Sequence, residues 1–369
     1  MSKYLILGGT GSLGKKLIDR LLNDEEFHSS NEVCVYSRDE AKHWTILNEL
    51  SSSPKFKESL RRLKFFVGDI RDATRTKDVI SLVRPDTIII AAALKQVDTC
   101  ERSPSESVAT NLIGTQNVVD AINFISSHSD YVKRVLFVST DKACAPVNVY
   151  GMCKAISERL ITSQSEWSQG VRFLAVRYGN VLESRGSIIP LFKYQAENAE
   201  HLTVTHPDMT RFVMTLDDSV DLILDTLKYA RSGQIFIPKL PAMRIGDLAE
   251  IFATLHNKQI KITGLRPGEK MHEELVNESE SIRTRVHKFD LRNYRDGSIH
   301  LKSDPYEIDP AHSTSYMAGH LVKPFRYTSA DDVMSKEKLF EHLTSLSIVN
   351  RPLSEFEGLR IEEINTNKK

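Results

Sequence analysis

The sequence predicts an α/β protein built on a doubly wound parallel sheet, with a smaller mixed α/β domain. Short, continuously apolar segments alternate with amphipathic segments over roughly the first 180 residues. Strands that helices cover on both faces have this continuously apolar character, because neither face meets water. A glycine-rich turn directly follows the first apolar segment, which is where such folds place a phosphate-binding turn.

The expected strands and helices follow in order along the chain. YLILGG at 4–9 predicts a buried strand, and LGKKLIDRLLND at 13–24 predicts an amphipathic helix. Further strands, with helical patterns between them, are expected at EVCVYSR (32–38), LKFFVGDI (63–70), TIIIAAA (87–93), RVLFVST (134–140) and RFLAVRYGNVL (172–182).

This rhythm of single strands and helices breaks beyond about residue 180, which predicts a second domain. The segment LTVTHPDMTRFVMTL mixes helical and strand patterns without a repeating unit. We therefore expect a dinucleotide-binding Rossmann domain at 1–180, a mainly substrate-binding domain at 181–285 and a divergent C-terminal arm at 286–369. Part of 212–245 is expected to return to the first domain.

The composition excludes several classes of protein. Forty-nine Lys and Arg residues balance 49 Asp and Glu residues, so no overall field favours nucleic acid or an anionic membrane. The cysteines at 34, 100, 144 and 153 have neither CxxC nor zinc-site spacing, so we expect reduced thiols and no metal. No apolar run approaches the ~18 residues of a membrane span, and the N-terminus lacks a signal-peptide core. We expect a soluble, cytoplasmic protein.

The turn GGTGSLGKKL joins the first strand to the first helix and predicts a site for the pyrophosphate of a dinucleotide. Gly8, Gly11 and Gly14 have GxxGxxG spacing. Glycine lets the backbone turn tightly and approach the phosphates, whose charge the helix N-terminus stabilises. The alternative is a glycine-rich turn that only packs helix on strand. The residues predicted to bind the cofactor here are Gly8, Thr10, Gly11, Ser12, Leu13 and Gly14.

The end of the second strand indicates which cofactor binds. NAD-preferring sites usually carry an acid there, whereas this chain has Ser37 and Arg38, and an arginine fork suits a 2′-phosphate. NADP is therefore favoured, and the alternative for Arg38 is a surface pair with Asp39. The adenine edge is expected at Asp69 and Ile70, with a plain strand-end turn as the alternative. The full set predicted at this end is Ser37, Arg38, Lys42, Asp69, Ile70 and Ala91.

The stretch VSTDKACAPVNVYGMCK at 138–154 is rich in reactive side chains. Tyr150 and Lys154 form YxxxK, and a spacing of four puts both on one helix face. A phenol with a pKa near 10 is a poor base at neutral pH, but a lysine ammonium and a nicotinamide cation nearby favour its phenolate. A solvated Tyr–Lys pair is the alternative. The motif gains specificity because it follows a strand that ends in Ser139 and Thr140.

The phosphate turn and the YxxxK pair together resemble those of extended short-chain dehydrogenases/reductases that act on nucleotide sugars. The motifs STDKA, AAALK, RYGNVLESRGSIIP, MTRF and RPGEKMHEEL resemble the inverting UDP-N-acetylglucosamine 4,6-dehydratases of the polysaccharide-biosynthesis group. The resemblance runs from residue 3 to about 285 with the motifs in order. Many membrane-anchored members carry methionine at the position of Tyr150, so this tyrosine favours the branch without a membrane segment.

This resemblance implies a role for each reactive residue. Tyr150 would accept the proton of the sugar 4-hydroxyl beside Thr140, while Lys154 holds Tyr150 and the cofactor ribose. Lys142 would remove the C5 proton, and protonated Asp141 would release the 6-hydroxyl as water, with a salt-bridged loop as the alternative. The resemblance also implies UDP-N-acetylglucosamine as substrate, an inverted 4-keto-6-deoxy product for surface glycans, and a homo-oligomer. By family position the substrate-binding residues would be Lys95, Asn180, Arg185, Arg211, Arg266 and Glu269.

Two other functions stay open at this point. A UDP-N-acetylhexosamine or UDP-glucose 4-epimerase would use the same turn and Tyr150, and would return hydride to C4. Related epimerases retain STDK, so that motif does not exclude an epimerase, and the identity of the product separates the two reactions. An inactive dinucleotide-binding scaffold is the remote alternative, against which the intact Thr140, Tyr150 and Lys154 argue.

Overall fold

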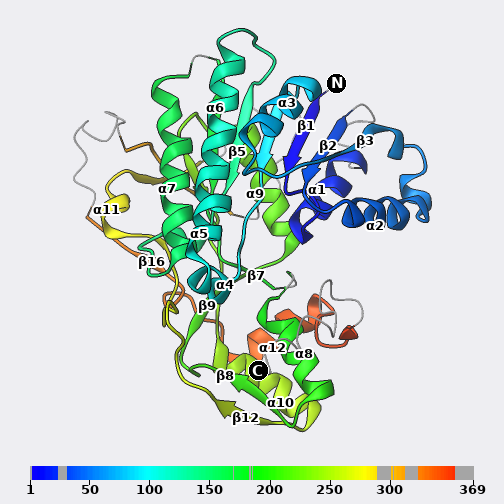
Figure 1. Cartoon of the computed structure of the whole chain (residues 1–369). Helices are drawn as coiled ribbons and strands as arrows, with labels where there is room; N and C mark the ends of the chain where they lie inside the picture. The colour runs from blue at the N-terminus through cyan, green and yellow to red at the C-terminus, as the bar shows by residue number, and fades with distance from the viewer. Residues whose placement is uncertain are drawn as a thin grey trace. The chain divides into compact units, whose positions relative to one another are not determined.

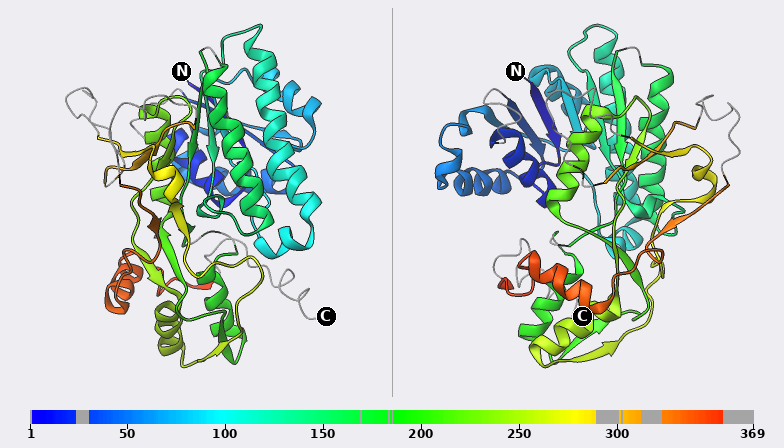
Figure 2. Two further views of the ribbon diagram at one scale, coloured as in Figure 1. Left: turned by 90° about the vertical axis from the view of Figure 1, so that its left-hand side faces the viewer. Right: turned by 180° about the vertical axis from the view of Figure 1, so that it is seen from behind.

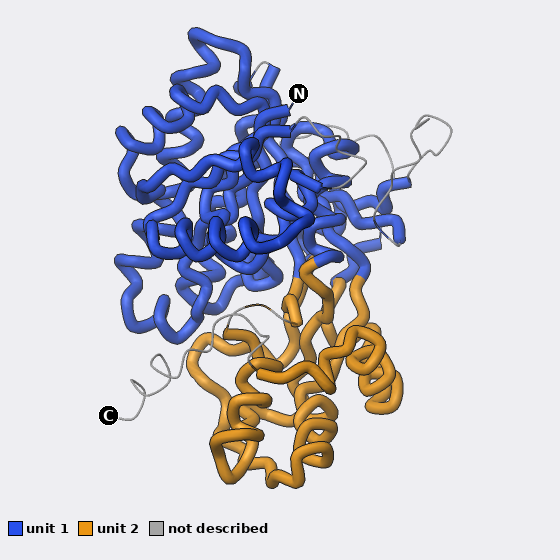
Figure 3. The backbone as a smooth tube through the Cα atoms, turned by 90° about the vertical axis from the view of Figure 1, so that its right-hand side faces the viewer, with its two compact units in different colours: residues 1–178, 217–239, 276–326 blue, residues 179–216, 240–275, 327–369 orange. Residues whose placement is uncertain are grey.

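The computed structural model describes residues 2–23, 31–168, 170–182, 184, 186–288, 301, 303–311 and 323–353. The chain divides into two compact units (Figure 3). Unit 1 comprises residues 1–178, 217–239 and 276–326, and unit 2 comprises residues 179–216, 240–275 and 327–369. Each unit is therefore assembled from three separate segments of the chain.

Unit 1 is built on a nine-stranded sheet, counting the strands in the described residues (Figure 1). The strands are β1 (Lys3–Leu7), β2 (Glu32–Ser37), β3 (Leu63–Val67), β4 (Thr87–Ile90), β5 (Arg134–Val138), β6 (Arg172–Val176), β10 (Ile235–Ile237), β14 (Thr284–Val286) and β15 (Tyr306–Ile308). Their order is β14-β15-β10-β6-β5-β4-β1-β2-β3. The strands from β10 to β3 pair in parallel, whereas β15 pairs antiparallel with β10 and β14 pairs antiparallel with β15.

The strand order of unit 1 reverses between β1 and β4. In doubly wound sheets, ligands bind at the carboxyl ends of the strands beside such a reversal. All of β4 and the last four residues of β1 are buried, as is usual where helices cover both faces of a sheet. The predicted α/β fold class is confirmed.

Helices cover both faces of this sheet (Figure 2). The helices of unit 1 among the described residues are α1 (Ser12–Asn23), α2 (Glu40–Ser51), α3 (Ala73–Val83), α4 (Val97–Arg102), α5 (Pro104–Ser107), α6 (Gly114–Ser126), α7 (Val149–Ser163), α9 (Leu216–Tyr229) and α11 (Glu278–Ser281). α6 packs between α3 and α7, and Arg20 of α1 donates to Asp221 of α9 at 2.8 Å. Asp39, Asp72 and Asn148 begin α2, α3 and α7, since each side chain accepts a hydrogen bond from a first-turn amide. None of the helices within the described ranges is long and apolar enough to cross a membrane.

Shorter helical segments complete unit 1. One π-helical stretch, η4 (Val108–Ile113), lies between α5 and α6, so residues 104–126 form an almost continuous helix of changing pitch. The 3₁₀ turns are η2 (Pro54–Phe56), η3 (Leu60–Arg62), η5 (Asp141–Ala143) and η6 (Gln164–Glu166).

Unit 2 is a smaller mixed α/β unit. Its elements are β7 (Asn180–Val181), α8 (Ile188–Asn198), β8 (His201–Val204), β9 (Thr210–Met214), β11 (Ala242–Arg244), α10 (Ile245–His256), β12 (Gln259–Ile262), β13 (Glu274–Val276), β16 (Tyr327–Thr328) and α12 (Lys336–Ser345). The strands are ordered β11-β9-β7, β12-β8 and β13-β16. Phe192 of α8, Phe252 of α10 and Leu339 of α12 are buried in one core, which holds the three helices together.

The chain crosses between the two units at positions that can be compared with the domain limits expected from the sequence. The chain leaves unit 1 after Tyr178 and returns to it at 217–239, as α9 and β10. Residues 286–326 belong to unit 1 and 327–369 to unit 2, so the expected C-terminal arm is divided. Within that arm, residues 289–300, 302, 312–322 and 354–369 lie outside the described residues.

Candidate active site

The turn after β1 and the first turn of α1 contain four glycines, and the three of the GxxGxxG pattern are required for different spatial reasons. Gly8 has a φ of +86°, and a Cβ there would lie 2.6 Å from the backbone of Ala92, just beyond β4. A Cβ at Gly14 would lie 2.3 Å from the carbonyl oxygen of Gly9, so α1 packs directly on the turn. A Cβ at Gly11 would meet only the Gly8 oxygen, at 3.8 Å. The surface at Gly11 is therefore open, and at the N-terminus of α1 it fits a pyrophosphate.

The other residues predicted for this turn lie at the same edge of the sheet. Thr10 and Leu13 are half-buried, and Ser12 begins α1. Ala91 follows β4, and its backbone amide donates to the carbonyl of Leu7 at 2.9 Å. They all lie at the reversal of strand order, where doubly wound proteins bind dinucleotides.

Two cations lie near the carboxyl end of β2, where the 2′-phosphate was predicted. The Arg38 side chain is 54% exposed, and its guanidinium lies 3.6 Å from Asp69. Lys42, one turn into α2, pairs with Asp39 at 2.9 Å. The alternative expected for Arg38, a pair with Asp39, is therefore not what the structure shows. Arg38 faces the acid that follows β3, and both cations keep a solvent-exposed side.

The remaining residues of this end have fixed partners. Asp69 accepts three hydrogen bonds from Arg71, two from the guanidinium at 2.7 and 2.9 Å and one from the backbone amide at 2.9 Å. Burial raises the pKa of Asp69, but the hydrogen bonds from Arg71 outweigh it and hold the pKa below its usual value. Ile70 is buried, and the Ser37 hydroxyl lies 2.6 Å from Nε2 of the buried His43. Asp69 is therefore a carboxylate at neutral pH, next to the predicted adenine position.

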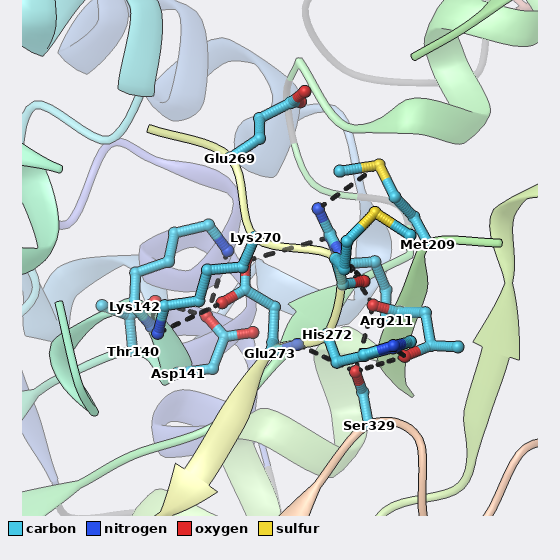
Figure 4. A network of polar contacts seen from close by, with 12 residues as sticks. Thr140, Asp141, Lys142, Met209, Arg211, Glu269, Lys270, His272, Glu273 and Ser329 are labelled. Atoms are coloured by element: carbon cyan, nitrogen blue, oxygen red, sulfur yellow. Dashed lines mark hydrogen bonds and ion pairs between the residues drawn. The ribbon is translucent and has the colours of Figure 1, made fainter. Parts of the chain in front are cut away.

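The loop after β5 forms η5, in which an acid and a base are neighbours (Figure 4). Thr140 caps this turn, and its hydroxyl donates to Oδ1 of Asp141 at 2.9 Å. The Lys142 ammonium donates to the same oxygen at 3.1 Å. The Asp141 side chain is 1% exposed and that of Lys142 is 19% exposed. A backbone hydrogen bond of 3.0 Å from Asp141 to the carbonyl of Tyr178 ties the loop to the end of β6.

Helix α7 carries Tyr150 and Lys154, and both side chains are buried. The helix approaches η5 closely, because a Cβ at Gly151 would lie 2.2 Å from the carbonyl oxygen of Lys142. The Lys154 ammonium donates to the carbonyl of Val138 at 2.5 Å. Tyr150 and Lys154 are thus held between the end of β5 and the acid–base pair of η5.

Burial moves the pKa values of Tyr150 and Lys154 in opposite directions. It raises the pKa of Tyr150 to about 12, although the Lys142 ammonium and a hydrogen bond from Thr140 oppose the change. It lowers the pKa of Lys154 to about 7, against the effect of Glu158. In the chain by itself Tyr150 is therefore a phenol at neutral pH, whereas the sequence argument favoured a phenolate. The cation that lowers its pKa is Lys142 rather than Lys154.

Sequence reasoning missed Asn111, which lies in the π-helical stretch η4. Its side chain holds the backbone of Leu94, accepting from the amide at 2.8 Å and donating to the carbonyl at 3.0 Å. Its own carbonyl accepts from the Ser157 hydroxyl of α7 at 2.7 Å. Asn111 therefore fixes the segment before the exposed Lys95 relative to α7. π-Helical stretches recur at functional sites, but the sequence has no pattern that marks one.

In unit 2, two predicted substrate residues lie on neighbouring strands. Asn180 is in β7 and Arg211 is in β9, which pair in parallel. Oδ1 of Asn180 is buried and accepts no hydrogen bond from the part of the chain that the structure describes. The Arg211 guanidinium donates to the carbonyls of Thr210 at 2.7 Å and Met271 at 3.2 Å (Figure 4). It also lies 3.9 Å from the buried Glu273, so its position is set by partners within unit 2.

Two further predicted substrate residues, Arg266 and Glu269, pair with each other in the loop before β13. Nε and Nη2 of Arg266 donate to Oε1 of Glu269 at 3.0 and 2.5 Å. Burial raises the pKa of Glu269, but the hydrogen bond from Arg266 outweighs it and lowers the pKa. The sixth predicted substrate residue, Arg185, lies outside the described residues.

The arrangement of unit 1 defines a class of protein. All of the predicted cofactor and catalytic residues come from the carboxyl ends of β1 to β5 or from the helices that follow them. A doubly wound sheet with a GxxGxxG turn, a threonine just after β5 and a Tyr–Lys pair on α7 is the arrangement of the extended short-chain dehydrogenases/reductases. The chain belongs to the polysaccharide-biosynthesis family of this class, because the family model described as "Polysaccharide biosynthesis protein" matches residues 4–293.

Similar proteins carry the names of two reactions. A UDP-N-acetylglucosamine 4,6-dehydratase (inverting) from Campylobacter jejuni is 37% identical over 329 residues, which cover 88% of this chain and 91% of that relative. A UDP-glucose 4-epimerase from Rickettsia bellii is 40% identical over 294 residues, which cover 79% and 81%. The solved structure of Pen from Bacillus thuringiensis is 33% identical with a TM-score of 0.78, and the match covers 94% of this chain and 98% of Pen. Sequence identity alone therefore does not separate dehydratase from epimerase.

Proposed function

We propose that the protein is an NADP-dependent UDP-N-acetylglucosamine 4,6-dehydratase that inverts C5 and acts in surface-glycan biosynthesis. The observation that carries this proposal is the buried Asp141 carboxylate, hydrogen-bonded to Lys142 at 3.1 Å beside Tyr150. Oxidation at C4 needs one base at the 4-hydroxyl, whereas elimination of water across C5 and C6 needs a further base and an acid. The dehydratase relative supports the proposal, because its match covers 88% of the chain against 79% for the epimerase.

In the first half of the reaction, Tyr150 accepts the proton of the sugar 4-hydroxyl. Its phenol must first lose its own proton, and the Lys142 ammonium and the Thr140 hydroxyl both favour that loss. Lys154, one helical turn away with a pKa of about 7, exchanges protons readily at neutral pH. Bound NADP supplies the hydride chemistry at C4 and C6.

In the second half, Asp141 and Lys142 eliminate water from the 4-ketone. One proton passes from Lys142 to Asp141 along their hydrogen bond, which gives a neutral amine and a neutral acid. The amine removes the C5 proton, which the ketone has made acidic, and the acid protonates the departing 6-hydroxyl. Water leaves and the ion pair is restored. Saturation of the C5=C6 bond would then take the hydride that NADP supplies at C6 and a solvent-derived proton at C5, and delivery of that proton to the opposite face completes the inversion.

The binding groups divide between cofactor and substrate. We assign the open turn at Gly11 to the pyrophosphate of NADP, and Arg38 with Lys42 to its 2′-phosphate. Arg211 and Arg266 bind the diphosphate of the substrate, since guanidinium forks bond phosphate oxygens in pairs. Lys95, Asn180, Arg185 and Glu269 are assigned to the substrate by family position, and the assembly implied by the family resemblance is a homo-oligomer.

A 4-epimerase is the second candidate, favoured by the Rickettsia bellii relative at 40% identity. It uses Tyr150 for the same first step and returns hydride to the other face of C4. It has no step that employs Asp141 and Lys142 as acid and base.

Isotope labelling with UDP-N-acetylglucosamine as substrate separates the two reactions. For the dehydratase, deuterium placed at C4 appears at C6, the C5 position gains deuterium from heavy water, and the product mass is lower by one water. An epimerase returns the C4 label to C4 and leaves C5 untouched. Mass spectrometry and NMR of the product distinguish these outcomes, and return of the label to C4 would overturn the proposal.

A further inference from the structure

A buried charge cluster lies next to the reactive stretch in unit 1, and no step of the proposed mechanism uses it. The Arg177 guanidinium is 1% exposed and binds two carboxylates. Its Nε donates to Glu158 at 3.1 Å, and its Nη2 makes a second hydrogen bond to the same carboxylate. Its Nη1 and Nη2 both donate to Glu280, each at 2.8 Å. The two glutamate side chains are at most 4% exposed, so the whole cluster is shielded from water.

Two members of this cluster are joined directly to the reactive elements. Glu158 lies on α7, one turn beyond Lys154. Arg177 follows β6 and directly precedes Tyr178, whose carbonyl accepts the backbone hydrogen bond of Asp141. The Arg177–Glu158 contact therefore links the helix that carries the Tyr–Lys pair to the strand end that holds the η5 loop.

Glu280 joins the cluster to the far end of the same loop. It lies on α11, where its side chain also completes a capping box with Asn277. Its Oε2 accepts a weak hydrogen bond from the Cys144 thiol at 3.6 Å, two residues beyond Lys142. Burial raises the pKa of Glu280, but the Arg177 guanidinium outweighs it and lowers the pKa to about 2. Glu280 is therefore ionised throughout the neutral range.

A buried ionic cluster of this kind contributes a fixed geometry more than it contributes stability. Apolar side chains of similar volume commonly give equal or greater stability than buried ions, because charges cost free energy to remove from water. A forked guanidinium adds directional contacts that fix the elements in one relative position. It also compensates the Glu158 charge, which lies one helical turn from the Lys154 ammonium.

The groups around Lys154 come from α7 and from the elements packed against it. Among the described residues, Glu158 is the charged group that favours the Lys154 ammonium. Strand β5 contributes the carbonyl of Val138 and the ring of Phe137, whose centre lies 3.9 Å from the ammonium. Other charged or titratable groups border this part of α7 among the described residues. They include Tyr150, Cys153 and Arg159 of α7, Asp141, Lys142 and Cys144 of the η5 loop, Cys100 and Glu101 of α4, Arg177 and Tyr178 after β6, and Glu280 of α11.

We propose that Arg177, held between Glu158 and Glu280, is a positioning residue that fixes helix α7 relative to the η5 loop. Through this contact the two reactive residues of α7 keep their place beside the acid–base pair of η5. The inference rests on the proposed function for the roles of those four residues. It has two consequences that a merely structural cluster lacks, one for the protonation of Lys154 and one for the first hydride step.

Glu158→Gln is the principal test, because it keeps the shape of the side chain and removes the charge one turn from Lys154. NADP affinity is measured by calorimetry across pH, and the reduced nicotinamide formed in a single turnover with UDP-N-acetylglucosamine is followed by absorbance. Loss of the carboxylate removes the charge that favours the Lys154 ammonium, so its pKa falls further. The pH at which NADP affinity declines should move to lower values, and the first hydride step should slow roughly tenfold or more.

Glu280→Gln is the second variant, and it tests the positioning role of Arg177 even if Glu158→Gln fails to fold. It leaves the Arg177–Glu158 pair intact and removes the charge that holds Arg177 to α11. The first hydride step should again slow roughly tenfold, whereas the pH midpoint of NADP binding should stay where the wild type has it. An unchanged hydride step in this variant would count against the positioning role.

Glu307→Gln is the matched control within unit 1. Glu307 is also buried, and it accepts hydrogen bonds from Arg285 at 3.1 Å and His287 at 2.8 Å. This variant should lower the thermal stability and leave both the pH midpoint and the hydride step unchanged. If the three variants differ from the wild type only in stability, the Arg177 cluster is structural and the inference is overturned. If wild-type protein does not convert UDP-N-acetylglucosamine, the proposed function fails, and the hydride step of Glu280→Gln is then compared with that of the wild type on UDP-glucose, because a 4-epimerase uses the same first step at Tyr150 and Lys154. An unchanged rate there would overturn the positioning role separately from the proposed function.

Discussion

The two ends of the predicted cofactor site in unit 1 differ in how deeply their charged side chains are buried. At the reactive end the Asp141 side chain is 1% exposed, and burial is the largest influence on the pKa values of Tyr150 and Lys154. At the adenosine end the Arg38 and Lys42 side chains are 54% and 43% exposed. Water screens charges at this rim, so each contact is worth less there than a comparable contact in the dry site. The reactive end should therefore respond strongly to single substitutions and the adenosine end weakly.

The largest effect is expected from Lys142→Met at the dry end. The substitution keeps the length of the side chain and removes the amine that we propose takes the C5 proton, so dehydration should fall on the order of 10³-fold or more. Transient formation of reduced nicotinamide should persist, because Tyr150 and Lys154 are unchanged. Single-turnover absorbance and product mass measure the two steps. The exposed Lys133 supplies the control, Lys133→Met, and dehydration by Lys142→Met at the rate of that control would show that the base lies elsewhere.

Lys154→Met should stabilise the fold while it removes a functional group. The pKa of Lys154 is about 7 in the folded chain, below the ordinary lysine value of 10.5. Between these values the folded state binds fewer protons than the unfolded state, so the unfolding free energy of the wild type rises as pH increases. The variant lacks this dependence. At pH 7 it should be more stable by about 3 kcal/mol, after allowance for the lost hydrogen bond to Val138.

Denaturant titrations of the cofactor-free proteins at several pH values test this expectation. The stability gap between Lys154→Met and the wild type should be widest near pH 7 and should close as the pH approaches the ordinary lysine value. Lys64→Met is the control, because Glu32 raises the pKa of this exposed lysine above its ordinary value. The stability difference between Lys64→Met and the wild type should therefore stay constant between pH 7 and the ordinary lysine value. A constant gap for Lys154→Met would mean that the buried amine does not titrate in this range.

Tyr150→Phe should lower turnover about 10²-fold, the usual contribution of a positioned base. The phenyl ring keeps the packing of α7 against η5, so folding and NADP binding should survive. Rapid-quench measurement of the first hydride step isolates the effect, and Tyr131→Phe is a control on a tyrosine away from the site. Near-normal turnover of Tyr150→Phe would assign the 4-hydroxyl proton to another group.

Local patterns in the sequence were sufficient to predict the parallel sheet, and they place the candidate reactive residues at its strand ends. β1, β4 and β5 are buried almost throughout, and such strands are continuously apolar because helices cover both faces. The reactive residues could be found because each stands in a short motif next to one of these strands. Tyr150 and Lys154 needed only helical spacing to reach one face of α7.

Contacts between distant segments could not be predicted in this way. Arg177 reaches Glu280 over 103 residues, and no local pattern in the sequence pairs them. Asn111 holds a loop 17 residues away from within a π-helical stretch, whose pitch the sequence does not indicate. The sequence offered Asp39 as the alternative partner of Arg38, whereas the folded chain pairs it with Asp69 on the neighbouring strand end. In each case the partner depends on tertiary packing rather than on spacing along the chain.

The smallest effect is expected at the solvent-exposed rim, from Arg38→Ala. A charged hydrogen bond to a 2′-phosphate is worth about 1.5 to 3 kcal/mol, and exposure favours the lower end of that range. NADP affinity should therefore fall roughly tenfold, as 1.4 kcal/mol corresponds to a factor of ten. NAD lacks the 2′-phosphate, so its affinity should change little. Calorimetry with both cofactors measures the difference, and Arg61→Ala is the control at an exposed arginine of the same unit. Equal losses of affinity for NADP and NAD would show that Arg38 does not bind the 2′-phosphate, because damage to the strand end would weaken the binding of both cofactors.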